Sequence, residues 1–259
     1  MIRIATLDSL AARPFALVPP AFPADVMPCA PAEVYSRAAT GMCDAALLPA
    51  ARLGEFDHLM EPLGAYGIAS ADAAFAATLV CQEPVEAVIT GGKPIGCTQR
   101  SQTVRDLLRH LARGAYGYEP VFTHETARAA DRLLIGDDAA LYQLCNRATG
   151  RCHDLGRWWR RAMGYPFVWA RWAVRRDLGA DSRRLLLDWL DETTACAATE
   201  AGRERLAEAG VASLTDVEAR AFARSYYTAV HVRLSLADLH GLSTFLRLQE
   251  MQEPWNKSA

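Results

Sequence analysis

Two long apolar strings, near 73–82 and 166–175, bracket the middle of this 259-residue chain and constrain its fold more than any other feature. The segment between them alternates short apolar strings with helical periodicity, and so does the part that precedes them. This alternation is typical of α/β proteins. The two strings can run side by side as the connection between two lobes. A single continuous doubly wound sheet is the alternative.

In the two-lobed arrangement, residues 1–82 and 166–259 form the first lobe, which includes the crossing strands, and residues 83–165 form the second. The length suits two lobes of about 100–150 residues each. After about residue 178 only helical periodicity is found, over 180–200, 202–209, 214–230 and 235–250. We expect these helices to pack on the first lobe of an α/β protein.

Composition excludes several classes of partner. The net charge is −2 and the sequence contains no long basic run, so a nucleic-acid surface is not expected. No apolar run reaches the roughly 18 residues of a membrane helix. The first strand, 2–7, starts almost at the first Met, and Asp8 and Arg13 interrupt the apolar pattern after it, so no signal peptide is expected. We predict a cytoplasmic protein without a membrane partner, and its oligomeric state stays open.

The residues that usually mark catalysis or metal binding form no constellation. The seven cysteines contain no CxxC pair, which argues against a zinc site or a disulfide framework and favours small core residues. The six histidines are scattered, and neither His231 nor His240 has an acidic residue four positions away. Phosphate-loop, dinucleotide and nucleophile-elbow motifs do not occur. We expect no metal and no cofactor, and we assign no catalytic residue.

The best candidate for an anion site is the turn 98–103. It follows a predicted strand at 94–97 and opens a predicted helix at 102–111. Backbone N–H groups at a helix N-terminus, with the nearby hydroxyls of Ser101 and Thr103, suit a carboxylate, and Arg100 or Arg13 can lie close. Ordinary N-capping by these hydroxyls is the alternative.

One region carries a specific resemblance. It runs LLIGDDAAL at 133–141, continues with DLG at 154–156 and Trp159, and ends with GYPFVWARW at 164–172. This region resembles the chorismate dehydratase family of menaquinone biosynthesis by the futalosine pathway. Further matches at the two ends of the chain are Arg3, Arg13, Pro14, Asp44, Leu48, Pro49, Tyr227, Leu234, Gly241, Leu242 and Phe245.

The resemblance implies a type 2 periplasmic-binding-protein-like fold with a site between the lobes. It also implies a lyase that removes water from chorismate, or from a related cyclic carboxylate, and leaves an aromatic enolpyruvyl benzoate. Aromatisation supplies much of the driving force, so such a site needs carboxylate anchors and a fixed pose. Ser101 and Thr103 match the family's Ser-x-Thr-Ser turn, and Asp137 matches its Gly-Asp.

The chain departs from the family where polar groups are expected. Ala11 stands in place of an Asn and Ala76 in place of a Ser. Ala50 replaces the Ser of a Pro-Ser pair, and Met163 replaces the Thr of a Thr-Gly pair. Each lost neutral contact weakens recognition by roughly 0.5–1.5 kcal/mol. These losses indicate a diverged member, and the positions 11 and 76 belong to the expected site.

Three functions therefore stay open. The first is a chorismate dehydratase-like lyase. The second is a non-catalytic cytoplasmic protein that binds a small carboxylate, or a diverged lyase with a different ligand. The third is the related dihydroxynaphthoate synthase, which we rank last because its His-containing signature is not found near the middle of the chain.

Overall fold

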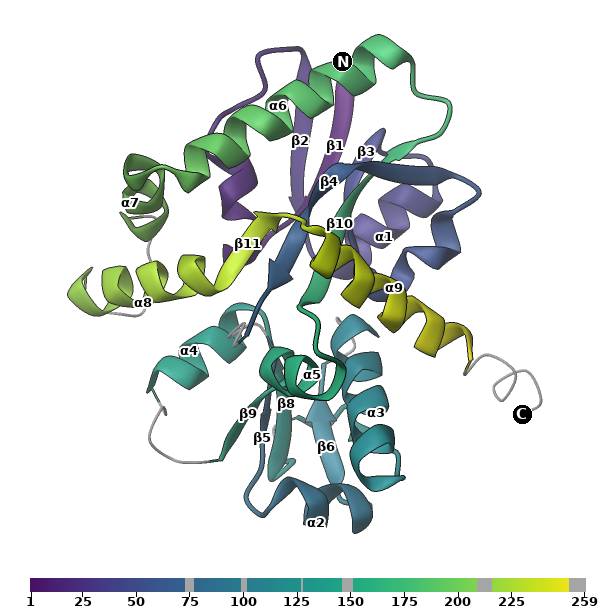
Figure 1. Ribbon diagram of the computed structural model, residues 1–259, viewed down its shortest axis with the longest axis vertical. Helices are drawn as coiled ribbons and strands as arrows, with labels where there is room; N and C mark the ends of the chain where they lie inside the picture. The colour runs from purple at the N-terminus through teal and green to yellow at the C-terminus, as the bar shows by residue number, and fades with distance from the viewer. Residues whose placement is uncertain (73–76, 99–101, 127, 146–150, 209–215, 252–259) are drawn as a thin grey trace. The chain divides into compact units, whose positions relative to one another are not determined.

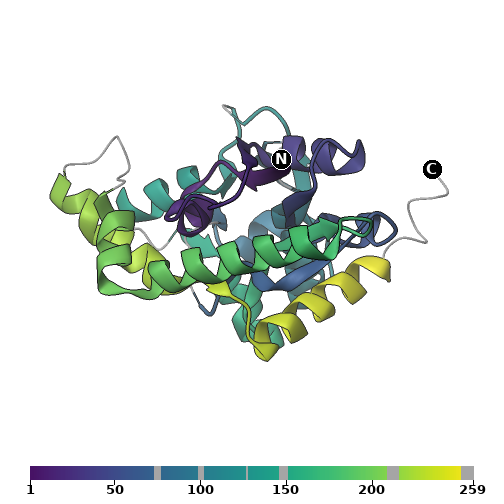
Figure 2. The ribbon, with the colours of Figure 1, turned by 90° about the horizontal axis from the view of Figure 1, so that it is seen from above.

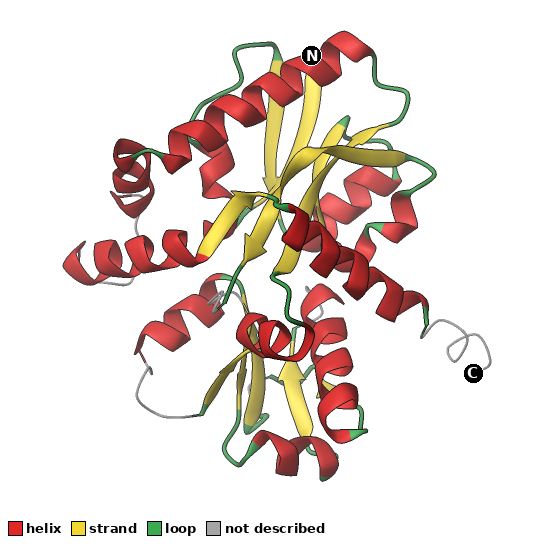
Figure 3. Ribbon diagram, in the orientation of Figure 1, coloured by secondary structure: helices red, strands yellow, loops and turns green. Residues whose placement is uncertain are grey.

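The computed structural model describes residues 1–72, 77–98, 102–126, 128–145, 151–208 and 216–251. Their contacts divide the chain into two compact units (Figure 1). The first unit comprises Met1–Ala69 and Val168–Ser235, and the second comprises Ser70–Phe167 and the segment from Leu236 onward. Each unit contains strands with helices packed around them (Figure 3). The chain therefore passes between the units three times.

The first unit is built on a mixed sheet that has six strands in the described residues. In spatial order they are β11 (Val230–Arg233), β4 (Met60–Ser70), β10 (Phe167–Arg175), β3 (Ala45–Pro49), β1 (Ile2–Leu7) and β2 (Ala24–Cys29). β1 pairs in parallel with β2 and β3, and β10 pairs antiparallel with β3. The helical segments are η1 (Leu10–Ala16), α1 (Pro31–Ala39), η2 (Ala50–Arg52), η3 (Gly54–Phe56), α6 (Ala180–Ala198), α7 (Glu200–Glu208) and α8 (Asp216–Ala229).

Alternate residues of a strand point to opposite faces of the sheet. Helical segments cover both faces of this sheet, so both are buried. One face packs against α1, and its buried cluster includes the strand residues Ala5, Ala46, Leu48 and Ala173. The other face carries Trp172, whose ring centroid lies 5.4 Å from that of Phe15 in η1 and 5.7 Å from that of Trp189 in α6. Segment η1, purple in Figures 1 and 2, lies beside α6.

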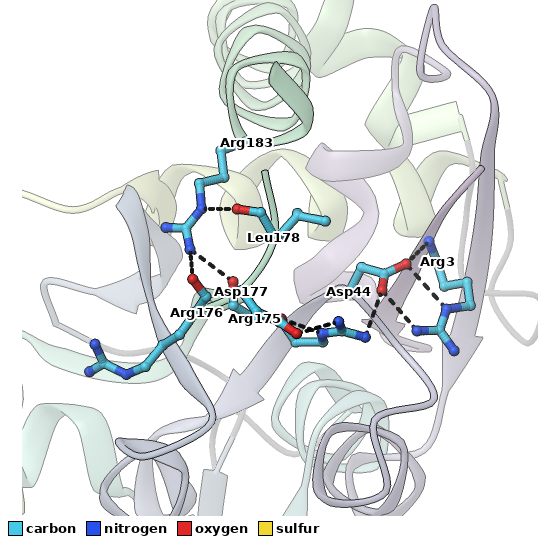
Figure 4. A network of polar contacts seen from close by, with 7 residues as sticks. All are labelled: Arg3, Asp44, Arg175, Arg176, Asp177, Leu178 and Arg183. Carbon is cyan, nitrogen blue, oxygen red and sulfur yellow. Dashed lines mark hydrogen bonds and ion pairs between the residues drawn. The ribbon is translucent and has the colours of Figure 1, made fainter. Parts of the chain in front are cut away.

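A charged network joins three strands of the first sheet (Figure 4). Asp44, which is 8% exposed, accepts hydrogen bonds from the backbone N–H and the guanidinium of Arg3 and from Arg175. Burial opposes ionisation of Asp44, but the bonds and charges of Arg3 and Arg175 outweigh it and lower the pKa of this carboxyl. Arg183 donates to the carbonyls of Leu178, Arg175 and Arg176 and fixes the turn before α6.

The second unit is built on a smaller sheet. In spatial order its strands are β7 (Val121–Thr123), β6 (Pro94–Cys97), β8 (Asp131–Ile135), β5 (Ala77–Val80) and β9 (Cys152–Asp154). Its helices are α2 (Val85–Thr90), α3 (Gln102–Tyr116), α4 (Asp137–Cys145), α5 (Leu155–Met163) and α9 (Leu236–Glu250). β6 is parallel to β7 and β8, whereas β5 is antiparallel to β8 and β9. Strands β6, β8 and β9 therefore all point the same way.

Helix α9 belongs to the second unit, which corrects the expectation that all C-terminal helices pack on the first lobe. The ring of Phe245 is fully buried and lies 5.1 Å from that of Phe167 and 6.1 Å from that of Trp159. At Gly241 an added Cβ would lie 2.2 Å from the carbonyl oxygen of Pro166, so only glycine permits this approach. Helical periodicity shows which face is apolar but not which unit that face covers.

The sequence predicted that the two apolar strings run side by side, but they lie in different sheets. The described part of the first string forms β5 in the second sheet, where it pairs with β8 and β9. The second string forms β10 in the first sheet, where its neighbour is β4. The sequence did not predict strand β4, because Pro62, Gly64 and Gly67 interrupt its apolar pattern. The second unit is therefore larger than the expected segment 83–165 and also contains β5 and α9.

Candidate functional site

The first unit has a topological switch point at the carboxyl end of β1. Strand β1 lies between β3 and β2. The segment η1, which leads from β1 toward β2, packs on the Trp172 face, whereas α1, which leads from β2 to β3, packs on the opposite face. Open α/β sheets bind ligands outside the carboxyl ends of strands at such a point. The candidate residues Ala11 and Arg13 both lie in η1, directly after β1.

Arg13 lines a small surface hollow between η1, α7 and α8. The side chains that line it with Arg13 are mainly apolar or aromatic, namely Leu10, Leu206, Phe222, Ala223, Tyr226 and Tyr227. The hydroxyl of Tyr227 donates a hydrogen bond of 3.0 Å to the carbonyl oxygen of Leu10 and holds α8 against η1. Ala11 is half-buried, and its methyl group has no polar atom to offer a ligand.

In the second unit, three helices begin at the same edge of the sheet. Helix α3 follows β6, α4 follows β8 and α5 follows β9, and these three strands point the same way. The N-terminus of a helix carries unpaired N–H groups and the positive end of the helix dipole. This edge therefore concentrates the groups that bind a carboxylate or another small anion.

The three helix starts differ in how far acidic side chains already neutralise them. Asp154 caps α5, and its Oδ1 accepts the backbone N–H of Arg157 at 2.9 Å. Helix α4 begins with Asp137 and Asp138. Helix α3 has no acidic residue in its first turn, which contains the buried Thr103. An incoming carboxylate would meet negative charge at α4 and α5, so α3 offers the most favourable start.

The start of α5 is packed closely against the first residues of the second unit. A Cβ added to Gly156 would lie 3.0 Å from the carbonyl oxygen of Asp72, 3.1 Å from Oγ of Ser70 and 3.2 Å from Oδ1 of Asp154. Arg157 also donates to Asp72 at 3.1 Å. Crowding therefore explains the glycine at position 156. The DLG motif at 154–156, which contributes to the family resemblance, thus has a structural reason at its glycine.

The expected site residues fall into three groups. Thr103 and Asp137 come to the same edge of the second sheet, because β6 and β8 are parallel neighbours. Ala11 and Arg13 lie in the first unit. Ser101, Arg100 and Ala76 lie outside the described residues. The sequence did not single out Asp154, although an Asp directly before a helix of apolar periodicity is an ordinary capping signal.

Within the described residues the acidic, cysteine and histidine side chains form no metal cluster, and the buried histidine of α3 is neutral at pH 7. Among the described residues no group of three or more His, Cys, Asp or Glu side chains could hold a metal ion. His110 in α3 is buried, and burial lowers its pKa to about 4, so it is neutral at pH 7. It packs edge-on against Phe245, with 5.6 Å between ring centroids.

No helix in the described ranges combines the length and the apolar character that crossing a bilayer requires.

Comparison with solved structures shows the fold. Protein AF1704 from Archaeoglobus fulgidus is 19% identical with a TM-score of 0.70, and the match covers 98% of each chain. The alkanesulfonate-binding protein SsuA from Xanthomonas axonopodis pv. citri, solved with MOPS, is 14% identical with a TM-score of 0.65 over 97% of this chain and 93% of that one. The CA3427 product of Candida albicans, described as having the generic periplasmic-binding-protein fold, is 9% identical with a TM-score of 0.60 over 97% and 90%.

These likenesses confirm the predicted α/β, periplasmic-binding-protein-like fold. In sequence, no curated protein matches the chain. A family model described as menaquinone biosynthesis matches residues 2–251, almost the whole chain. The protein therefore belongs to the menaquinone biosynthesis family.

Proposed function

We propose that the protein is a chorismate dehydratase-like lyase that anchors a carboxylate of its substrate at the N-terminus of α3. The observation that carries the proposal is the contrast at one edge of the second sheet. Helix α4 begins with Asp137 and α5 is capped by Asp154, whereas α3 has no acidic residue in its first turn, which contains the buried Thr103. Membership of the menaquinone biosynthesis family supports a cyclic carboxylate as the substrate class.

The reaction would remove the ring hydroxyl of chorismate together with a neighbouring ring proton as one molecule of water. The ring becomes aromatic, and the product is an enolpyruvyl benzoate. Because aromatisation favours the products, the protein has mainly to hold the carboxylates and the ring in one pose. Helix N–H groups and hydroxyls can hold such groups. Free thiols are found at Cys29, Cys43, Cys81, Cys97, Cys152 and Cys196, and the first four are buried, which suits the reducing cytoplasm that the proposal includes.

The second candidate is a non-catalytic protein that binds a small carboxylate, or a diverged lyase with a different ligand. The observation in its favour is Ala11, which places a methyl group where a polar side chain could orient the substrate. A binding protein of this fold needs only the anion anchor, and SsuA shows that relatives of this fold hold small molecules.

The test measures both binding and turnover. Thr103→Val keeps the branched shape and removes the hydroxyl. It should weaken chorismate binding by roughly 0.5–1.5 kcal/mol, or about 2- to 12-fold in Kd, by calorimetry. The matched control is Thr90→Val, at the end of α2, whose hydroxyl donates a hydrogen bond to the carbonyl oxygen of Glu86. Unchanged affinity in Thr103→Val would remove α3 as the anchor.

Turnover separates the two candidates. Aromatic product formed from chorismate, detected by chromatography, supports the lyase. Tight chorismate binding without product supports the binding protein. Replacing Ala11 by Asn should raise product formation if the site has lost only that contact.

A further inference from the structure

Three buried side-chain polar atoms in the first unit lack a hydrogen-bond partner among the described residues, and two of them lie on one face of the sheet. These two are the hydroxyl Oγ1 of Thr6 and the indole Nε1 of Trp172, while the third, Nε of Arg171, belongs to the neighbouring residue of β10 and lies on the opposite face. Trp172 is fully buried, and Thr6 is 9% exposed. Proteins pair nearly all of their buried polar groups, because an unpaired group loses its bonds to water without replacement. Two such atoms in one place therefore require a specific explanation.

Strand register places these two residues in one row of the sheet. Trp172 of β10 lies directly opposite Leu47 of β3. On the other side of β3, Ile4 and Ala5 of β1 pair with Ala45 and Ala46. The next residue of β1, Thr6, is therefore level with Leu47. Thr6 and Trp172 flank Leu47 across two strand spacings, about 10 Å between Cα atoms.

Both side chains point to the face that η1 and α6 cover. Ala5, Ala46 and Ala173 belong to the cluster against α1, so their neighbours in the strands point the other way. Trp172 does so visibly, since its ring meets Phe15 of η1 and Trp189 of α6. The row lies two residues from the carboxyl end of β3, beside the switch point described above.

Other polar groups on this face are paired. The indole N–H of Trp189 donates to the carbonyl oxygen of Val18 at 2.8 Å. The hydroxyl of Thr193 donates to the carbonyl oxygen of Pro14 at 2.9 Å. The hydroxyl of Thr194 donates to the carbonyl of Leu190 at 2.6 Å. An aromatic face could receive the N–H of Trp172, because its neighbours stand nearly perpendicular to it, but this contact is weak and leaves Thr6 unexplained.

We propose that Thr6 and Trp172 form a subsite within the first unit for a neutral oxygen of a small cyclic acid, such as a hydroxyl, ether or carbonyl oxygen. The inference rests on the proposed function for the ligand class. An indole N–H only donates, and a threonine hydroxyl donates or accepts, so an oxygen acceptor satisfies both. The neighbours Leu47, Phe15 and Trp189 are apolar or aromatic, and a carboxylate buried among them would be strongly disfavoured.

The first arm of the test uses the protein without ligand and compares matched pairs. Thr6→Val removes an unpaired hydroxyl and should raise the unfolding temperature, whereas Thr194→Val removes a paired one and should lower it. Trp172→Phe and Trp189→Phe lose similar volume, and Trp172→Phe should lower the unfolding temperature less. If Thr6→Val is destabilised as much as Thr194→Val, a tightly bound water already satisfies the hydroxyl and the proposal is wrong.

The second arm measures chorismate binding by calorimetry. Thr6→Val and Trp172→Phe should each bind roughly 2- to 10-fold more weakly than the wild type, while Thr194→Val keeps its affinity. Weaker binding by Thr103→Val together with unchanged binding by Thr6→Val and Trp172→Phe would overturn the subsite and leave the proposed function standing.

If chorismate does not bind to the wild type, the proposed function fails, and the first arm alone decides the subsite. A more stable Thr6→Val then supports a subsite for another ligand with a neutral oxygen, and a less stable one removes it.

Discussion

The amide Nε2 of Gln249 donates a hydrogen bond of 3.1 Å to Oδ2 of Asp106 and ties the end of α9 to α3. Asp106 also accepts hydrogen bonds from the side chains of Gln102 and Arg109 in its own helix. One buried carboxylate therefore bonds to three side chains. The contact places α9, which begins at Leu236, in the same packed unit as the candidate anion site at the start of α3.

Phe245→Ala should destabilise the second unit by about 3–5 kcal/mol, because it removes a fully buried ring and leaves a cavity beside Trp159 and Phe167. Urea unfolding measures the change. Arg247→Ala, on the exposed side of the same helix, should stay within about 0.5 kcal/mol of the wild type. A small effect of Phe245→Ala would show that α9 is not part of this core.

His110 should make stability depend on pH between about 4 and 6.5. Burial lowers its pKa to about 4; Asp106 opposes this, and Arg113 and Arg109 add to it. The unfolded chain then binds a proton that the folded chain does not, so stability is complete above pH 6.5 and falls as the pH drops toward 4.

The slope from this group is at most about 1.4 kcal/mol per pH unit, and partial solvation reduces it. Urea unfolding at pH 7, 6 and 5 should show a smaller slope in His110→Leu. His58→Gln, at an exposed position, should keep the slope of the wild type. Equal slopes in all three proteins would contradict this assignment.

Asp44→Asn should cost roughly 2–3 kcal/mol, because Arg3 and Arg175 would face each other without the carboxylate between them. The cost stays below the 3–5 kcal/mol of a fully buried pair, since the two arginine side chains are 37% and 32% exposed. Thermal or chemical unfolding measures it. Asp177→Asn, whose side chain is 71% exposed, should change stability much less, and an equal loss in the two variants would contradict the role given to Asp44.

Gly67→Ala should disrupt the first sheet, because an added Cβ would lie 2.4 Å from the carbonyl oxygen of Ala170 and 3.0 Å from Leu234. We expect a loss above 2 kcal/mol or insoluble protein, as overpacking of a core typically costs about 1–3 kcal/mol. Gly114→Ala is the control. It lies in α3 with open space around it and should gain roughly 0.5–1 kcal/mol. A stable Gly67→Ala would mean that β4 and β10 can separate at this point.

The sequence predicted the α/β class because the alternation of apolar strands and helices is a local pattern. It does not depend on how the strands and helices are divided between the two units. It did not predict β4, since Pro62, Gly64 and Gly67 conceal a strand whose pairing with β10 depends on a side chain being absent. It also misplaced α9, because an apolar helix face does not reveal which core it completes.

The candidate site was predictable only where a local signal existed. Thr103 stands at a helix start after an apolar strand, and that pattern can be read along the chain. Thr6 looks like an ordinary strand residue, and its pairing across Leu47 with Trp172 is a property of the register alone. Asp154 has a capping signal, but only the direction of β9 shows that it shares an edge with Thr103.

The position of α9 has a consequence for synthesis on the ribosome. The second unit begins at Ser70, yet the helix that covers Phe167 and Trp159 starts only at Leu236. Nearly seventy residues of the first unit are translated in between, from Val168 to Ser235. During that interval the nascent second unit presents an uncovered aromatic surface, which is the kind of surface that chaperones bind. The first unit can finish folding while the second still waits for its last helix.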